Sequence, residues 1–478
     1  MTSGAVVETV ARKAASPWVV LASTGLATFT VFLDTTILFV AFSAIGRSFP
    51  DVSLASLSWV LNVYTIVFAA VLIPAGRLAD RIGRRKTFLG AVVLFTGASM
   101  ACGLAPTPGV LVAARALQAI GAAALVPSSL ALVLQTFPKA KIPVAVAIWG
   151  AIGAVAGAVG PTLGSYVVAH WGWRWAFYIN LPVGLFSLAL GSRVLPEGRE
   201  AKRGRLPDPL SIVLLASALS LMAYAIVETE RWGWSSATFL VTFAASVVLL
   251  LLFVRRSGRV ESPLLDLRLF AAPSFRWANL AMLTFSIGFS AMFLGNVLFF
   301  THVWKYSIFE AGLAVSIGPL IVAVTAPLFG RLAGRVGQRT LLVPGGIVWA
   351  SGGLLLLARV TETPAYTTHY LPPIILTGLG VALCLPQLSS VAVQGLPPDS
   401  FGAGSAVMQA VRNLGATLGV ALAVAFTSER AGASLASFQH VWWLLVASGL
   451  SVTALTYNLP RRVAPKVAPI VPAPIAPE

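Results

Sequence analysis

The amino-acid sequence predicts an all-α membrane protein with fourteen transmembrane helices, and three observations support this prediction. Of the 478 residues, 57% are apolar and 10% are charged, with a mean hydropathy of +0.87, whereas soluble domains use roughly 25% charged residues. Apolar runs long enough to cross a bilayer recur along the whole chain. The connections between these runs alternate between many and few basic residues.

The apolar runs form two groups of six, separated by a pair. A membrane span needs about 20 apolar residues. The first group covers residues 18–42, 57–75, 87–104, 110–134, 142–168 and 176–195. The pair covers residues 210–227 and 238–254. The last group covers residues 277–300, 311–328, 341–357, 371–393, 406–426 and 441–459.

This grouping predicts the domain organisation. The run at 18–42 is too long for a signal peptide and lacks a convincing cleavage site, so we interpret it as the first span. The Pro/Ala-rich end of the chain cannot form a core, which predicts a disordered tail. The predicted parts are an N-terminal segment 1–17, a six-helix bundle 18–195, a linker with two extra helices 196–276, a second six-helix bundle 277–459 and the tail 460–478.

The distribution of basic residues predicts the orientation in the membrane. Of the 33 Lys and Arg residues, 25 fall on the side of the two termini, with Arg193 at the end of the sixth run counted there, six fall in the opposite loops and two lie inside spans. Since basic residues concentrate on the cytoplasmic side, we expect both termini to be cytoplasmic. Arginine outnumbers lysine 26 to 7, a bias typical of GC-rich bacterial genomes, so we expect the inner membrane of a bacterial cell.

Several other classes of protein are disfavoured. The net charge of +17 is spread between apolar runs and does not form a basic face for nucleic acid. Cys102 and Cys384 fall inside apolar runs, as packing residues do. The chain has no phosphate-binding loop for ATP and no nucleophile motif, so we expect a protein that is not an enzyme and uses no cofactor. We also expect a monomer. Four scattered histidines suggest no metal site: His170, His302, His369 and His440.

A short motif recurs at equivalent positions of the two six-helix groups. Gly76 opens the segment GRLADRIGRRK, and Gly330 opens the near copy GRLAGRVGQRT, 254 residues later. A basic loop that sets the membrane topology would account for the positive charges of each segment. It would not account for the same motif at the equivalent loop of both groups, which indicates duplication rather than chance. Parallel repeats of this kind build transporters whose substrate site lies between the halves near the midplane.

From Trp18 to Leu459 the sequence resembles the fourteen-span drug:proton antiporters of the major facilitator superfamily. The resemblance implies the major facilitator fold. The loop after the second span is similar to the superfamily signature, in which an acid and arginines gate the conformational change. In the second copy Gly334 replaces the acid. The residues to which the resemblance assigns this gating role are Gly76, Asp80, Arg81, Gly83, Arg84 and Arg85.

Two further motifs lie in the fourth and fifth spans. Arg115, Gln118 and Gly121 resemble a family motif whose arginine is implicated in proton transfer, although Ala119 stands where a glycine is usual. The fifth span resembles the antiporter motif, in which small residues permit close helix approach. Its residues here are Gly153, Gly157, Gly160, Pro161 and Gly164, followed by Ser165 in place of the usual final glycine.

The first and sixth spans also resemble this branch of the family. Leu33-Asp34-Thr-Thr-Ile37 is similar to its first-helix motif, but Phe39 and Ser43 replace the expected asparagine and proline. These departures imply a different substrate range. The segment WRWAFYINLPVG, from Trp173 to Gly184, is the most specific match, and we expect it to be structural.

Asp34 is the one carboxylate well inside a predicted span, and intramembrane ionisable residues are by default functional hypotheses. The span limits place Asp34 about 12 Å and Arg115 about 8 Å from the outer surface, so the two can meet. We hypothesise that Asp34 binds the driving proton, because burial favours the neutral carboxyl and an approaching Arg115 favours the charged one. The alternative is a buried pair that only orders two helices. For Arg412, a functional, a packing and a snorkelling role remain open.

These observations favour a proton-driven efflux antiporter that exports lipophilic drugs or metabolites. The resemblance implies alternating access, with protons and membrane lipid as further partners. With one membrane carboxylate, we expect neutral or monocationic substrates. The alternative is a proton-coupled symporter that imports a small solute, which is expected to carry more polar residues in its cavity helices.

Overall fold

The computed structural model of the chain is built from helices. The described residues contain no β-strand. Fourteen of their helical segments are long and apolar enough to cross a membrane, which confirms the predicted number of spans. The residues that the structure describes are 16–138, 141–196, 207–397, 400–427 and 434–459.

The helices of the first half follow one another through short connections. They are α1 (Pro17–Ser48), α2 (Leu54–Leu57), α3 (Trp59–Ile82), α4 (Arg84–Leu104), α5 (Pro108–Thr136), α6 (Ile142–Trp171), α7 (Trp175–Tyr178) and α8 (Asn180–Val194). The linker holds α9 (Pro209–Val227), α10 (Thr229–Trp232), α11 (Ala237–Ser257) and the short η2 (Leu267–Ala271). The second half holds α12 (Pro273–His302), α13 (Ile308–Val336), α14 (Gln338–Arg359), η3 (Tyr366–Tyr370), α15 (Leu371–Gln394), α16 (Phe401–Phe426) and α17 (Leu435–Tyr457).

The helices extend beyond the apolar runs from which the spans were predicted. The first run ends at residue 42, but α1 continues to Ser48, and α13 continues to Val336 rather than to residue 328. Backbone hydrogen bonding does not stop where polar side chains begin, so hydropathy marks the membrane layer and not the helix ends. These two helices therefore continue six and eight residues beyond the predicted apolar runs.

The internal repeat is also present in the backbone. Gly83 separates α3 from α4 with φ of +111°, and Gly337 separates α13 from α14 with φ of +89°. Glycine adopts this region without the steric cost that a Cβ atom brings. The two turns lie 254 positions apart, as the two copies of the sequence motif do.

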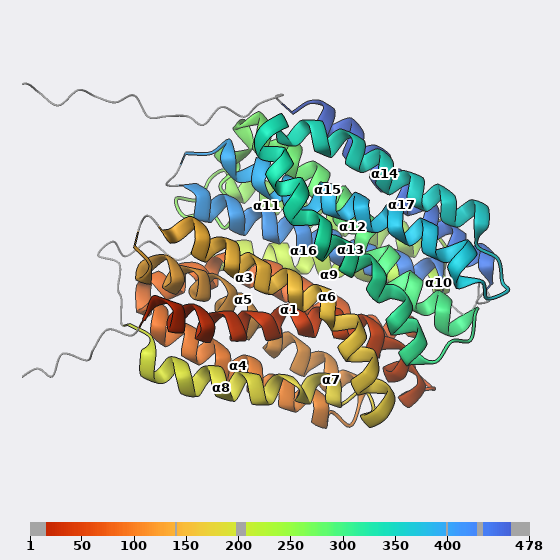
Figure 1. Cartoon of the computed structure of the whole chain (residues 1–478), viewed down its shortest axis with the longest axis horizontal. Helices are drawn as coiled ribbons and strands as arrows, with labels where there is room; N and C mark the ends of the chain where they lie inside the picture. Colours follow the sequence, from red (N-terminus) through yellow and green to blue (C-terminus); the bar gives the residue numbers. More distant parts are fainter. Residues whose placement is uncertain (1–15, 139–140, 197–206, 398–399, 428–433, 460–478) are drawn as a thin grey trace, which may run out of the picture.

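The two halves form adjacent bundles of nearly parallel helices (Figure 1). The first half, coloured red to yellow, lies along one side, and the green to blue helices of the second half lie along the other. Among the linker helices, α9 packs against α3 of the first half and α16 of the second, as well as against α11. The linker pair therefore attaches to the outside of the junction between the halves.

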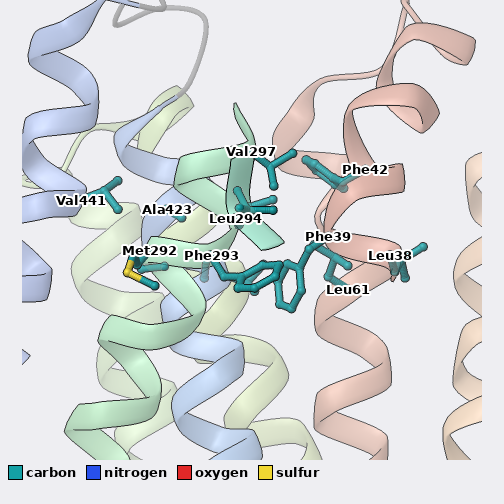
Figure 2. Close-up of a cluster of buried hydrophobic side chains, with 14 of the residues drawn as sticks. Leu38, Phe39, Phe42, Leu61, Met292, Phe293, Leu294, Val297, Ala423 and Val441 are labelled. Carbon is teal, nitrogen blue, oxygen red and sulfur yellow. The ribbon is translucent and has the colours of Figure 1, made fainter. Parts of the chain in front are cut away.

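The halves are closed against each other at one end. We name the end at which α1 stops at Ser48 the distal end, and the end at which α1 begins at Pro17 the proximal end. Near the distal end the rings of Phe39 and Phe293 lie 5.2 Å apart, and the hydroxyls of Ser43 and Thr301 lie 3.4 Å apart. Figure 2 shows this contact between α1 and α12 as a continuous cluster of apolar side chains.

The proximal end is packed differently. In the described residues, two buried apolar clusters there consist of first-half side chains and one consists of second-half side chains. Only the partly buried Ala406 of α16 packs against a cluster of the other half. The structure therefore has a dry contact between the halves distally and largely separate cores proximally.

Candidate functional site: a buried carboxylate network

The carboxylate of Asp34 lies in the interior of the first half. Arg115 Nη1 donates a hydrogen bond to Asp34 Oδ2 over 2.6 Å, and both side chains are only 2% exposed. No other charged side chain is buried to this degree in the described parts of the chain. An ion pair removed from water in this way costs desolvation, which is recovered only if the remaining donors and acceptors are also paired.

Two amides complete the pairing of the carboxylate. Gln118 Nε2 donates to Asp34 Oδ1 over 2.9 Å, and Asn180 Nδ2 donates to the same oxygen over 3.1 Å. Both amides also donate to Ser99 Oγ, over 3.1 Å and 2.9 Å. Ser99 in turn donates to the carbonyl of Phe177. The network joins α1, α4, α5 and α8 around one negative charge.

The guanidinium of Arg115 is held on several sides. Its Nε donates to the carbonyl of Val60 over 3.1 Å, and its Nη1 also donates to Gln118 Oε1 over 2.6 Å. Its Cζ lies 4.1 Å from the centroid of the Tyr64 ring, a cation–π contact. Arg115 and Gln118 meet the carboxylate together because residues three apart share one face of a helix.

The structure brings Asp34 and Arg115 into contact, as expected. Along the helices, Asp34 lies about 21 Å from the distal end of α1 at Ser48, and Arg115 lies about 10 Å from the distal end of α5 at Pro108. The expected depths of about 12 Å and 8 Å were counted from the ends of the apolar runs and not from the helix ends. These depths in the membrane stay a prediction.

The predicted gating residues surround the turn between α3 and α4. Gly76, Asp80 and Arg81 lie in the last turns of α3, and the other three begin at the turn. Asp80 pairs with Arg84 Nε over 3.1 Å. Arg85 Nη2 donates to the carbonyl of Ser192 at the end of α8 over 2.7 Å. These contacts stay within the first half, and the gating role remains a prediction.

The glycine motif of α6 allows close packing against α1. A Cβ atom on Gly160 would overlap Thr36, and one on Gly164 would lie 3.0 Å from Ile37. Gly157, on the same helix, has nothing within 4 Å of that position.

The rest of the motif packs in two directions. A Cβ on Gly153 would lie 3.0 Å from Phe32 of α1. Pro161 lies inside α6, and Ser165 packs against Gly312 of α13 in the other half. The motif therefore lies where α6 contacts both its own half and the second half.

Arg412 lies in the middle of α16 and away from the carboxylate network. Its side chain is partly exposed and makes no hydrogen bond or ion pair with any described residue. Its neighbours Gly415 and Gly419 pack against the backbone of α12. Arg412 therefore has no acidic partner among the described residues, whereas Arg115 pairs with Asp34.

The sequence did not predict the roles of Asn180 and Ser99 in the network. Asn180 lies in the segment that was expected to be structural, yet its amide binds the carboxylate directly. A polar amide within an otherwise apolar helix was the available signal. No group of three or more His, Cys, Asp or Glu side chains within the described ranges is arranged to hold a metal ion.

Comparison with known proteins identifies the family. The sequence profile described as Major Facilitator Superfamily matches residues 24–306 and 280–477. The chain belongs to this superfamily. The transporter is 37% identical over 408 residues to the multidrug resistance protein Stp of Mycobacterium tuberculosis, covering 84% of this chain and 74% of that protein. It is 31% identical over 447 residues to the methylenomycin A resistance protein of Streptomyces coelicolor, covering 92% and 93%.

These relatives and the fourteen spans place the superfamily member among the 14-spanner drug:proton antiporters. Solved structures agree in fold. The peptide transporter POT in complex with sulfate has a TM-score of 0.68 at 13% identity, covering 92% of this chain and 94% of that one. The xylose transporter XylE from E. coli has a TM-score of 0.64 at 15% identity, covering 93% and 96%. At these identities the likeness concerns the fold alone.

Proposed function

We propose that the protein is a proton-coupled efflux antiporter that exports lipophilic small molecules from a bacterial cell across its inner membrane. The observation that carries the proposal is the carboxylate of Asp34, buried and bound by Arg115, Gln118 and Asn180. The names of the relatives, which include a multidrug resistance protein and an antibiotic resistance protein, support efflux as the direction. The proton gradient is the energy source, and no cofactor is required.

Asp34 is the proposed proton-binding group. In the conformation described here, one cation and two amide donors surround the carboxylate. Movement of α5 or α8 away from α1 would remove these donors, and we propose that this movement accompanies proton binding. Proton binding and helix position then influence each other, which is the linkage that coupled transport requires.

Alternating access would proceed by separation of the distal contact. Phe39 on α1 and Phe293 on α12 close the distal end in this structure. With the termini cytoplasmic, as the distribution of basic residues predicts, this conformation admits substrate from the cytoplasm. Opening the distal contact and closing the proximal end would release the substrate outside.

The test uses a panel of fluorescent probes that differ in charge, in everted vesicles from efflux-deficient cells expressing the protein. The panel contains N-dansyl-phenylalanine, its neutral primary amide and the cation ethidium. Respiration-driven accumulation of at least one probe, abolished by a protonophore, supports the proposal. Accumulation that survives the protonophore but collapses without an opposing sodium gradient would contradict proton coupling.

A further inference from the structure

Arg412 lies on the polar side of an amphipathic helix. Helical residues advance by about 100° each, so Arg412 shares one side of α16 with Ser405, Gln409 and Asn413. The opposite side is apolar and packs against the hydrophobic core through Val411, Leu414 and Leu418. A polar side on a membrane helix faces a protein interior or a water-accessible space rather than lipid.

The position of Ala423 relates this side of α16 to the contact between the halves. Ala423 follows Arg412 by eleven residues, or about three turns, so both lie on nearly the same line along α16. Ala423 is fully buried in the distal cluster, near Leu294 (Figure 2). Arg412, about 16 Å nearer the proximal end, is partly exposed. The same side of α16 therefore passes from the buried distal cluster to a partly exposed position nearer the proximal end.

Two other helices show a similar change from buried to partly exposed side chains, one turn below the distal contact. On α12, Phe293 belongs to the distal contact, whereas Phe289, one turn before it and 6.0 Å away between ring centroids, is partly exposed. On α1, Phe39 belongs to the contact, and Thr35, one turn before it, is partly exposed. Phe289, Thr35 and Arg412 are thus all partly exposed on the proximal side of the distal contact.

The charges in the membrane interior are unbalanced. Only three charged side chains in the described spans lie more than six residues from both ends of their helix: Asp34, Arg115 and Arg412. Asp34 and Arg115 neutralise each other. Arg412 has no acidic partner in the described structure, and an unpaired cation at this depth is costly. Snorkelling is disfavoured because Arg412 lies about 13 Å from the start of the span at Ala403.

We propose that Arg412 binds an anionic group of the transported compound, a carboxylate or phosphate carried on an aromatic or apolar body. The guanidinium supplies paired donors that match such a group, and the partly exposed ring of Phe289, nearer the distal end, supplies apolar surface. This inference rests on the proposed export function and names its substrate class. It differs from the expectation of neutral or monocationic substrates, which counted Asp34 and took no account of an unpaired Arg412.

The test measures binding to the full-length protein in phosphatidylcholine nanodiscs, by energy transfer from tryptophan to a dansyl group. The probes are matched pairs of N-dansyl amino acids and their primary amides, with phenylalanine and leucine bodies. The proteins are wild type, Arg412→Gln, Arg412→Lys and the control Arg276→Gln, which removes an exposed cation at the start of α12. A parallel series with phosphatidylglycerol shows whether a lipid phosphate competes for the same cation.

For at least one pair, we expect wild type and Arg276→Gln to bind the acid about tenfold or more tightly than the amide. Arg412→Gln is expected to abolish this preference, and Arg412→Lys to retain part of it. Equal binding of acid and amide by wild type in every pair, or an acid preference unchanged in Arg412→Gln, would overturn the proposal. Competition by phosphatidylglycerol that is lost in Arg412→Gln would support an anion site that lipid also enters. The binding measurement requires no proton gradient, so its outcome is independent of proton coupling. If the acid preference is intact but transport proves independent of protons, the proposed function is overturned and the anion site stands.

Discussion

Asn180 donates a hydrogen bond from its Nδ2 to Oδ1 of Asp34 over 3.1 Å, and so joins α8 to α1 at the buried carboxylate. Gln118 on α5 donates to the same oxygen. Asn180 and Gln118 therefore hold one carboxylate oxygen from two different helices. Under the proposed function, Asn180 is a positioning residue for Asp34.

Replacement of Asn180 by Ala is expected to weaken proton-driven transport more than exchange without a gradient. The substitution removes one hydrogen bond to the buried carboxylate, a loss of about 1–3 kcal/mol, and leaves the Asp34–Arg115 pair in place. The measurement compares uphill transport of a probe with exchange of labelled for unlabelled probe in proteoliposomes. Asn458→Ala, at the exposed end of α17, serves as the control. Equal losses of both activities would indicate a purely structural contact.

The two glycines of α6 are expected to respond differently to the same substitution. A Cβ at position 160 would overlap Thr36, so Gly160→Ala should destabilise the α1–α6 contact by about 1–3 kcal/mol. Gly157→Ala meets open space and gains helix propensity, so it should be neutral or stabilising by up to about 1 kcal/mol. Melting of the purified variants, followed by tryptophan fluorescence, compares them directly. Equal losses at both positions would refute the packing argument.

A disulfide across the distal contact is expected to arrest transport. Ser43 and Thr301 approach within 3.4 Å through their side-chain oxygens, on α1 and α12. The double variant Ser43→Cys/Thr301→Cys should therefore cross-link on mild oxidation and lose transport, because the distal end can no longer open. A reducing agent should restore the rate, and each single cysteine variant should be unaffected by oxidation. Normal transport by the fully cross-linked protein would exclude alternating access through this contact.

The linker helices carry a pH-dependent ion pair. Asp208, at the start of α9, accepts two hydrogen bonds from Arg256, at the end of α11, one of them over 2.9 Å. The side-chain hydrogen bond from Arg256 holds the pKa of Asp208 well below its usual range, assisted by hydrogen bonds from Ser211. A lowered pKa means that the folded state binds this proton less readily than the unfolded state. The stabilisation is therefore present above the ordinary value near 4 and is lost as the pH falls below it.

The variant Asp208→Asn isolates this contribution. At pH 7 its melting temperature should lie slightly below that of wild type, because a partly exposed pair contributes little. The difference between the two proteins should shrink as the pH falls below about 4. A difference that stays constant down to pH 3 would show that the charge of Asp208 is not responsible.

Hydropathy was sufficient to predict the fourteen spans, because the bilayer sets the length of each apolar run. The pairing of Asp34 with Arg115 was also predictable, since two opposite charges in an apolar interior require each other. The contribution of Asn180 was not predictable, because a neutral amide can hydrogen-bond to many kinds of group and need not lie beside a charge. The closed distal end was not predictable either, since every state of an alternating transporter shares one sequence.

Proton coupling through Asp34 is the central claim, and transport by reconstituted Asp34→Asn protein tests it most directly. Proteoliposomes are loaded with a probe that wild type transports, and two activities are compared: uphill transport driven by a pH gradient, and exchange of labelled for unlabelled probe without a gradient. We predict that Asp34→Asn retains exchange, which needs only a folded protein that changes conformation, and loses uphill transport. Uphill transport at the wild-type level in Asp34→Asn would contradict the account and leave the Asp34–Arg115 pair as a structural contact between two helices.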